Sequence, residues 1–182
     1  MRKSNIILLV LLGIIAAWSC TPRNPFGGPV YDFAGNLKRD SLLIADFLKT
    51  APIDSLYRIH DASGVVIIVQ EEGNGIKPSV GNLIYCNYTG RLLDGIVFDT
   101  NSESVAREND IYDENRQYRI FQFSLGGSEA IRGFDVGFRN LKSGSKGVLI
   151  IPSPWAYQDR TTVERVPANS VLVFDVEFLG LD

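Results

Sequence analysis

The chain has 182 residues, of which 45% are hydrophobic and 10% aromatic, enough apolar material for one sizeable core. Its 18 Lys and Arg residues are nearly balanced by 21 Asp and Glu residues, so the formal net charge is −3. Proteins that bind nucleic acid present a basic face. The composition therefore predicts no nucleic-acid partner.

Residues 1–19 predict a lipoprotein signal peptide. Two basic residues precede an apolar run over residues 6–17, and at about 12 residues this run is shorter than the roughly 20 that a membrane-spanning helix needs. The run ends in Ala-Trp-Ser-Cys, which resembles the processing site of bacterial lipoproteins. We therefore expect acylation at Cys20 and membrane attachment through this lipid anchor, with a plain secretory signal as the alternative. By the same resemblance, Thr21 after the cysteine favours the outer membrane, with the protein facing the periplasm.

Residues 20–36 are rich in Pro and Gly and predict a tether between the lipid anchor and the folded part. Apolar pairs four residues apart predict a helix over residues 37–49, and residues 54–58 predict a further helical turn. We interpret residues 37–62 as a helical N-terminal extension. This extension could pack on the main domain or mediate dimerisation, and the sequence leaves both alternatives and the oligomeric state open.

From residue 63 onward the pattern is that of β-strands. Alternating or β-branched apolar residues predict strands over residues 65–70, 83–93, 97–99, 118–125, 148–151 and 171–179. Two polar stretches, residues 100–117 and 158–169, predict exposed loops. Cys86 alternates with apolar neighbours in its strand, which indicates a buried apolar side chain rather than a reactive thiol.

One short helix is predicted between these strands. Ile131, Phe134, Phe138 and Leu141 recur at steps of three and four residues, so they share one helix face. A lone helix between strands buries such a face against the concave side of a sheet. We therefore expect an α+β fold with a curved antiparallel sheet wrapped around one short helix. The first turn of a helix has unpaired N–H groups, and aromatic residues at that end indicate a binding cleft.

The residue types needed for several catalytic classes are scarce. The chain has one histidine, His60, and two cysteines, which argues against a Ser-His-Asp arrangement and against a His/Cys metal cluster. The glycine-rich segment at residues 125–128 lacks the Lys-Ser/Thr of a phosphate-binding loop. We expect no cofactor and no metal.

Six short motifs resemble the FKBP-type peptidyl-prolyl cis-trans isomerases and occur in the order typical of that family. They are Tyr88-Thr89-Gly90, Phe98-Asp99, Phe121-Gln122-Phe123, Ala130-Ile131-Arg132-Gly133-Phe134, Pro154-Trp155-Ala156-Tyr157 and Val173-Phe174-Asp175-Val176-Glu177. The resemblance covers residues 63–182. It implies an FKBP-like fold and a catalyst of X–Pro bond rotation in proline-containing unfolded or exported polypeptides.

The resemblance also implies a site. Its catalytic residues would be Tyr88, Phe98, Asp99, Tyr157 and Phe174, and its substrate-binding residues would be Phe121, Glu129, Ala130, Ile131, Phe134 and Val166. Phe134 would form the floor of the pocket. The Ile131 N–H and the Tyr157 hydroxyl would donate hydrogen bonds to substrate carbonyls, and Asp99 would be the polar member of the lining.

The sequence departs from the family pattern at three places. Phe134 replaces the usual tryptophan, and Gln158 replaces the glycine that follows the pocket tyrosine. The segment after Asp99 is longer than usual, so Arg107, Arg116 and Arg119 all remain candidates for the arginine that pairs with the pocket aspartate. These departures keep a second hypothesis open, a non-catalytic FKBP-like binding or chaperone module of an envelope complex.

Overall fold

The computed structural model describes residues 30–182, and Tyr31–Asp182 form one compact unit. The predicted signal peptide, Cys20 and most of the predicted tether lie outside the described residues. Within the described part of the chain, none of the helices combines the length and the apolar composition needed to cross a bilayer.

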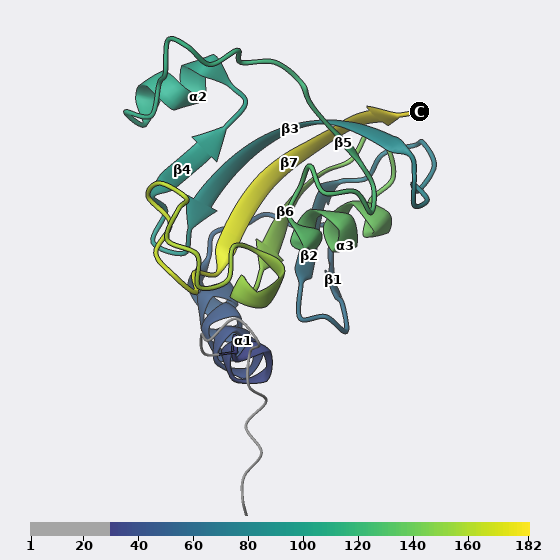
Figure 1. Ribbon diagram of the computed structural model, residues 1–182. Coiled ribbons are helices and arrows are strands. Elements are labelled where there is room, and N and C mark those ends of the chain that lie inside the picture. Colours follow the sequence, from purple (N-terminus) through teal and green to yellow (C-terminus); the bar gives the residue numbers. More distant parts are fainter. Residues whose placement is uncertain (1–29) are drawn as a thin grey trace, which may run out of the picture. The chain divides into compact units, whose positions relative to one another are not determined.

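A seven-stranded antiparallel sheet curves around helix α3, as the sequence predicts (Figure 1). Six strands follow the order β1-β2-β6-β7-β3-β4, and β5 pairs with β3 beside β4. The elements are α1 (Phe33–Thr50), β1 (Tyr57–His60), β2 (Val66–Glu71), β3 (Leu83–Leu92), β4 (Val97–Thr100), α2 (Glu103–Glu108), β5 (Phe121–Ser124), α3 (Arg132–Asn140), β6 (Lys146–Ile151), the 3-10 helix η1 (Ser153–Trp155) and β7 (Leu172–Leu181). The predicted strands are confirmed to within a few residues at their ends.

Helix α3 lies close against β6 because two of its residues have no side chain. A Cβ atom at Gly133 would come within 2.3 Å of Ile151 Cγ2, and one at Gly137 would come within 2.4 Å of Leu149 Cδ1. The two glycines are four residues apart and therefore share one helix face. The apolar side chains Phe134 and Phe138 on α3 are buried in the core beneath it.

The central strands are apolar on both faces. In β2, Ile67 and Val69 face the core that contains α3, whereas Val66 and Ile68 belong to a second apolar cluster. Strand β6 and the start of β7 divide in the same way, whereas farther along β7 the outer face carries Asp175 and Glu177. Because side chains alternate across a strand, the second cluster lies on the opposite face of the sheet, where α1 covers it with Ile44. Of the two alternatives that the sequence left open for α1, the structure shows packing on the main domain.

Two predictions for the N-terminal extension are corrected. Helix α1 begins at Phe33, inside the predicted tether, because Asp32 caps it by accepting a hydrogen bond from the Gly35 N–H at 2.9 Å. The helical turn predicted at residues 54–58 is wrong, since Tyr57–His60 form strand β1, which pairs with β2. Strand β2 provides backbone hydrogen-bond partners for this segment along one edge. The sequence of residues 57–60 alone does not reveal this pairing.

The polar stretch 100–117 is not simply an exposed loop. It contains α2, whose Ala106 is fully buried, and Thr100 and Asn101 are buried where the stretch leaves β4. An ion pair of 2.7 Å between Glu103 and Arg107, four residues apart, supports the helix. Because few of these residues are apolar, hydrophobic periodicity could not reveal α2.

Since α1 covers one face of the sheet, truncating its buried side chain should destabilise the whole domain. Ile44 is 3% exposed, so Ile44→Ala should lower the free energy of unfolding by about 2–5 kcal/mol. Urea denaturation followed by circular dichroism measures this loss. Leu42→Ala, on the same helix at a position 69% exposed, is the control and should change stability by less than about 0.5 kcal/mol. Equal stability of the two variants would contradict the covering role of α1.

Candidate functional site

A cavity of about 600 Å³ opens at the N-terminal end of α3, within the range of roughly 300–1,000 Å³ typical of sites for small ligands. Of the eleven candidate residues named from the resemblance, nine line it. They are Tyr88, Asp99, Phe121, Glu129, Ala130, Ile131, Phe134, Tyr157 and Phe174. The sheet contributes lining residues from β3, β4, β5 and β7, and the segment after η1 contributes Ala156, Tyr157, Gln158 and Arg160.

Phe98 and Val166, which the resemblance also placed in the walls, do not line this cavity. Both are buried in the core, with exposures of 8% and 5%. Phe98 packs edge-to-face against Tyr157 and Phe174, with ring centroids 6.4 and 5.6 Å apart. Its place in the structure is therefore behind the wall, where it supports two aromatic rings that face the cavity.

The aromatic walls meet at Phe134. Its ring makes edge contacts with Tyr88 and Phe174, at centroid separations of 6.0 and 4.8 Å, and with Phe121 at 6.4 Å. Such arrangements place the positive edge of one ring against the negative face of another. Phe134 lines the cavity and is only 3% exposed, and its role as the floor of the pocket stays a prediction.

The polar part of the wall is a triangle of three side chains. The Tyr88 hydroxyl donates to Asp99 Oδ2 at 2.7 Å, while Arg116 donates from Nη1 to Asp99 Oδ1 at 2.5 Å and from Nη2 to the Tyr88 oxygen at 3.1 Å. Of the three arginines left open by the sequence, the structure selects Arg116. Burial, and next the nearby Asp99 carboxylate, raise the pKa of Tyr88 well above its usual value, so its hydroxyl keeps its proton.

Asn101 holds Tyr88 in place, and sequence reasoning missed it. Strand β3 is bordered by β4 at one end and β5 at the other, and Asn101 lies in the gap between them. Its Oδ1 accepts from the Tyr88 N–H at 2.7 Å, and its Nδ2 donates to Asn87 Oδ1 at 3.0 Å and to the Arg119 carbonyl at 3.1 Å. A polar residue directly after a strand was the only available signal.

Several hydrogen-bond donors of the lining have no partner among the described residues. Two of them are neutral groups suited to a ligand carbonyl, the backbone N–H of Ile131, which is the N-cap residue of α3, and the hydroxyl of Tyr157. Burial, and next the Asp99 carboxylate, raise the pKa of Tyr157. Both donors are therefore neutral groups that can bind a ligand carbonyl in a partly dry cavity.

The residue after Tyr157 has an unusual backbone. Gln158 has a φ of 59°, a conformation that glycine adopts freely and other residues rarely do. This conformation accounts for the glycine usual at the corresponding position in the family. Gln158 also lines the cavity, together with Pro154, Ala156 and Arg160, which the sequence analysis did not single out as site residues.

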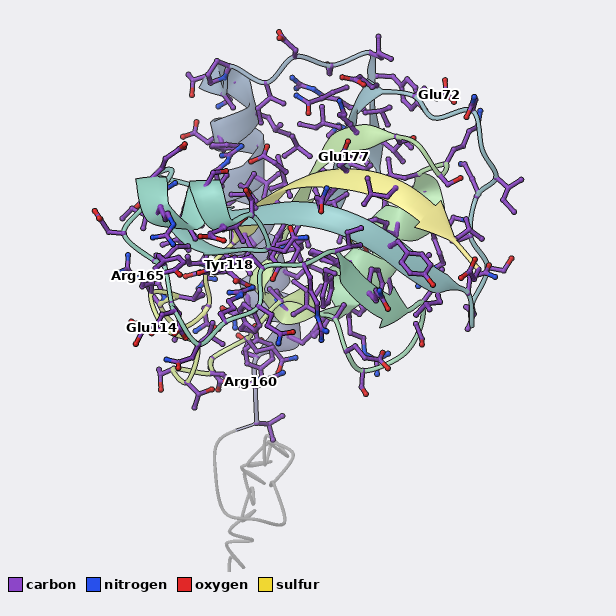
Figure 2. The ribbon with its side chains drawn as sticks, turned by 90° about the horizontal axis from the view of Figure 1, so that it is seen from above. Glu72, Glu114, Tyr118, Arg160, Arg165 and Glu177 are labelled. Carbon is purple, nitrogen blue, oxygen red and sulfur yellow. The ribbon has the colours of Figure 1, made fainter. Side chains whose placement is uncertain are left out.

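The insertion between β4 and β5 forms a stacked rim next to the site. The Arg107 guanidinium lies 3.5 Å from the centre of the Tyr112 ring, which stacks on Tyr118 at 5.7 Å. Arg165, in the loop before β7, donates to the Asp110 carbonyl at 2.8 Å and so connects that loop to the insertion. Figure 2 shows Tyr118 and Arg165 on the same side of the molecule. Arg116 belongs to this rim, which places its guanidinium next to the Asp99 carboxylate.

The chain resembles known proteins in sequence. A sequence model described as FKBP-type peptidyl-prolyl cis-trans isomerase matches residues 74–179. FK506-binding protein 1 of Saccharomyces cerevisiae is 40% identical over 105 residues, which cover 58% of this chain and 81% of that protein. FK506-binding protein 4 of Candida glabrata is 33% identical over 118 residues, which cover 65% of this chain and 26% of that protein, so the chain spans about a quarter of that relative's length.

A solved structure, FkpA from Escherichia coli, has a similar fold. It superposes with a TM-score of 0.58 at 30% identity, covering 81% of this chain and 63% of that one.

Because Asn101 is 9% exposed and satisfies the backbone of Tyr88, Asn101→Ala should leave a buried N–H unpaired. That should lower the free energy of unfolding by about 1–3 kcal/mol. Thermal or urea unfolding measures the change. Asn115→Ala provides the matched control, because Asn115 is exposed and bonds only its neighbour Asp113. If both substitutions change stability equally, Asn101 does not have the bridging role assigned here.

Proposed function

Because the chain belongs to the family of FKBP-type peptidyl-prolyl cis-trans isomerases, we propose that it catalyses rotation about X–Pro bonds in proline-containing polypeptides. The observation that carries the proposal is the aromatic cavity with two unpartnered neutral donors at its walls, the Ile131 N–H and the Tyr157 hydroxyl. Such a cavity can receive a prolyl ring and hydrogen-bond the carbonyls on either side of it.

Rotation about an X–Pro bond is slow because resonance gives the amide partial double-bond character, with a barrier of roughly 18–20 kcal/mol. At the twisted transition state this resonance is lost, so the carbonyl and nitrogen are less dipolar than in the planar amide. Moving a polar group out of water without giving it a hydrogen-bond partner costs free energy. An apolar cavity therefore costs the twisted amide less than the planar one, and only such differential binding lowers the barrier.

The residues divide this work. Phe121, Phe134 and Phe174 supply the apolar surface for the ring, while the donors on Ile131 and Tyr157 orient the flanking carbonyls. Asp99 remains in the lining as a carboxylate paired with Arg116. Tyr88 is held between them, with its hydroxyl bonded to Asp99. In this scheme, the chain's own side chains bind and orient the substrate, and no bond to the substrate is made or broken.

A single aromatic truncation tests the proposal. Phe121 lines the cavity, so Phe121→Ala should lower kcat/KM for isomerisation of a short prolyl peptide at least about tenfold, a barrier change of roughly 1.4 kcal/mol. A protease-free or NMR exchange assay measures the rate. Phe47→Ala is the matched control, because Phe47 packs in the cluster on the other face of the sheet. It should reduce stability and leave kcat/KM within about threefold of the wild-type value.

Two outcomes would overturn the assignment. If the wild-type chain binds prolyl peptides without accelerating their isomerisation, the protein is the non-catalytic binding module considered in the sequence analysis. If the wild type is active and Phe121→Ala keeps full activity, the proline does not bind in this cavity.

We further propose that the protein works in the cell envelope, attached by an acylated Cys20 to the periplasmic face of the outer membrane. The sequence supports this location through a basic start, a short apolar run and a cysteine at its end. Stable attachment needs more than one acyl chain, and lipoprotein processing adds both thioether-linked and amide-linked chains to such a cysteine. The clients would then be exported polypeptides that fold near the membrane.

The anchor has a direct test. Cys20→Ala should abolish incorporation of labelled fatty acid and release the protein from membranes in a high-salt wash, while the wild type remains membrane-bound. Fractionation and acyl labelling of cells expressing each form measure both effects. A wild-type chain that takes up no label, together with a variant that stays with the membrane, would contradict the lipoprotein assignment.

A further inference from the structure

Helix α1 contacts the segment that carries Tyr157 through a buried charge. Asp40 is fully buried at 0% exposure. Its Oδ2 accepts from the backbone N–H of Ser153 at 2.7 Å, and its Oδ1 accepts from Arg39 Nε at 2.9 Å and Nη2 at 2.6 Å. Buried carboxylates are costly unless they are paired and hydrogen-bonded. This one is paired, and its partner on the sheet side is the first residue of η1.

The partner of Asp40, Arg39, contacts the loop before β7 as well. Arg39 Nη2 also donates to the Asn169 carbonyl at 2.7 Å. The Asn169 N–H in turn donates to the carbonyl of Gln158 at 2.6 Å. Asp40 thus bonds the chain before Tyr157, at Ser153. Arg39 bonds it at Asn169, which is itself hydrogen-bonded to Gln158, the residue after Tyr157.

Aromatic contacts reinforce this attachment. Phe33 of α1 packs edge-to-face on Trp155 at a centroid distance of 5.2 Å, and Trp155 donates from Nε1 to the Ser63 carbonyl at 2.9 Å. The short green turn next to α1 in Figure 1 is η1, and the two elements are in direct contact. The turn is therefore held against both α1 and the chain that leads into β2.

The segment needs such support because its backbone is strained. Gln158 has a φ of 59°, in the left-handed region that non-glycine residues rarely adopt. Conformations of this kind persist only when their surroundings hold them. Tyr157, whose hydroxyl is an unpartnered donor of the cavity, directly precedes this residue.

We propose that Asp40 is a positioning residue for the site. It acts from the opposite side of the turn, without touching the substrate, by fixing η1 so that the Tyr157 hydroxyl keeps its place at the cavity wall. The proposal rests on the isomerase function proposed above and extends it to α1, which lies outside the matched region 74–179. An element that covers the other face of the sheet thereby helps to shape the cleft.

The test compares aspartates on the same helix. In the full chain, Asp40→Ala should lower kcat/KM for a prolyl peptide by about tenfold, since a misplacement of about 1 Å caused by a distant change can cost about 100-fold. Asp40→Asn keeps an acceptor for Ser153 but loses the ionic pair with Arg39, so its loss should be smaller. Asp46→Ala, whose side chain is 81% exposed, should retain full activity. All rates are measured at a temperature where each variant is folded.

A double-mutant cycle separates positioning from general destabilisation. If Asp40 acts through Tyr157, Asp40→Ala should lower kcat/KM less than about twofold in a Tyr157→Phe background, because the hydroxyl it positions is already gone. Fully additive losses would overturn the proposal. Unchanged activity of folded Asp40→Ala would overturn it as well. If Asp40→Ala fails to fold, the cycle is run with Asp40→Asn.

Hydrogen exchange gives a readout that does not depend on catalysis. In Asp40→Asn the amides of Ala156 and Gln158, which donate to the Ser153 carbonyl at 3.1 Å, should exchange faster by about tenfold or more, while amides of β3 keep wild-type rates. Uniformly faster amide exchange throughout the domain, or no change in exchange at all, would refute the proposal that Asp40 fixes η1. An inactive wild type would refute the proposed function alone, and this exchange pattern would still decide the role of Asp40.

Discussion

The structure depends on one constraint: strands β2 and β6, together with the first residues of the neighbouring β7, are apolar on both faces and must be covered on both. Ile67, Leu149 and Phe174 belong to the core that contains α3, whereas Ile68, Ile150 and Val173 belong to the cluster beneath α1. A sheet that left either face in water would expose large apolar side chains, at roughly 25 cal/mol per Å². Helix α3 therefore buries one face of these strands and α1 buries the other, and the fold requires both helices.

The cleft arises where the concave core reaches its end. Phe134 and Phe174 are almost fully buried and yet reach the cavity, so each belongs to the core and to the wall at once. The close approach of α3 to β6 brings the N-terminal turn of the helix, with its unpaired N–H groups, next to these rings. Rings in the walls support one another by edge contacts, and Phe98 adds support from behind. A rigid apolar wall with fixed donors is suited to selecting a twisted amide over a planar one.

The second cover also bears on the site. Through its hydrogen bonds to Ser153 and Asn169, α1 connects the outer face of the sheet to the turn that carries Tyr157. The insertion between β4 and β5 acts on the cavity wall directly, because it brings Arg116 onto Asp99 and Asn101 onto Tyr88. Helix α1 and the insertion thus both support the cleft, α1 from behind the turn that carries Tyr157 and the insertion at the polar part of the wall, and both act through hydrogen bonds to charged or backbone groups.

The sequence by itself indicated the strands β2 to β7 and the helix α3 through local periodicity, and its short motifs, through their resemblance to a known family, indicated nine residues that line the cavity. It also contained a sign of the second cover, since runs such as Val65–Val69 are apolar at every position and indicate strands buried on both faces. Only the tertiary structure decided that α1 provides that cover, that β1 joins the sheet, that Arg116 pairs with Asp99 and that Phe98 lies behind the wall. Periodicity reports which face of an element is apolar. It does not report which distant element covers that face, because that choice depends on contacts between segments far apart in the chain.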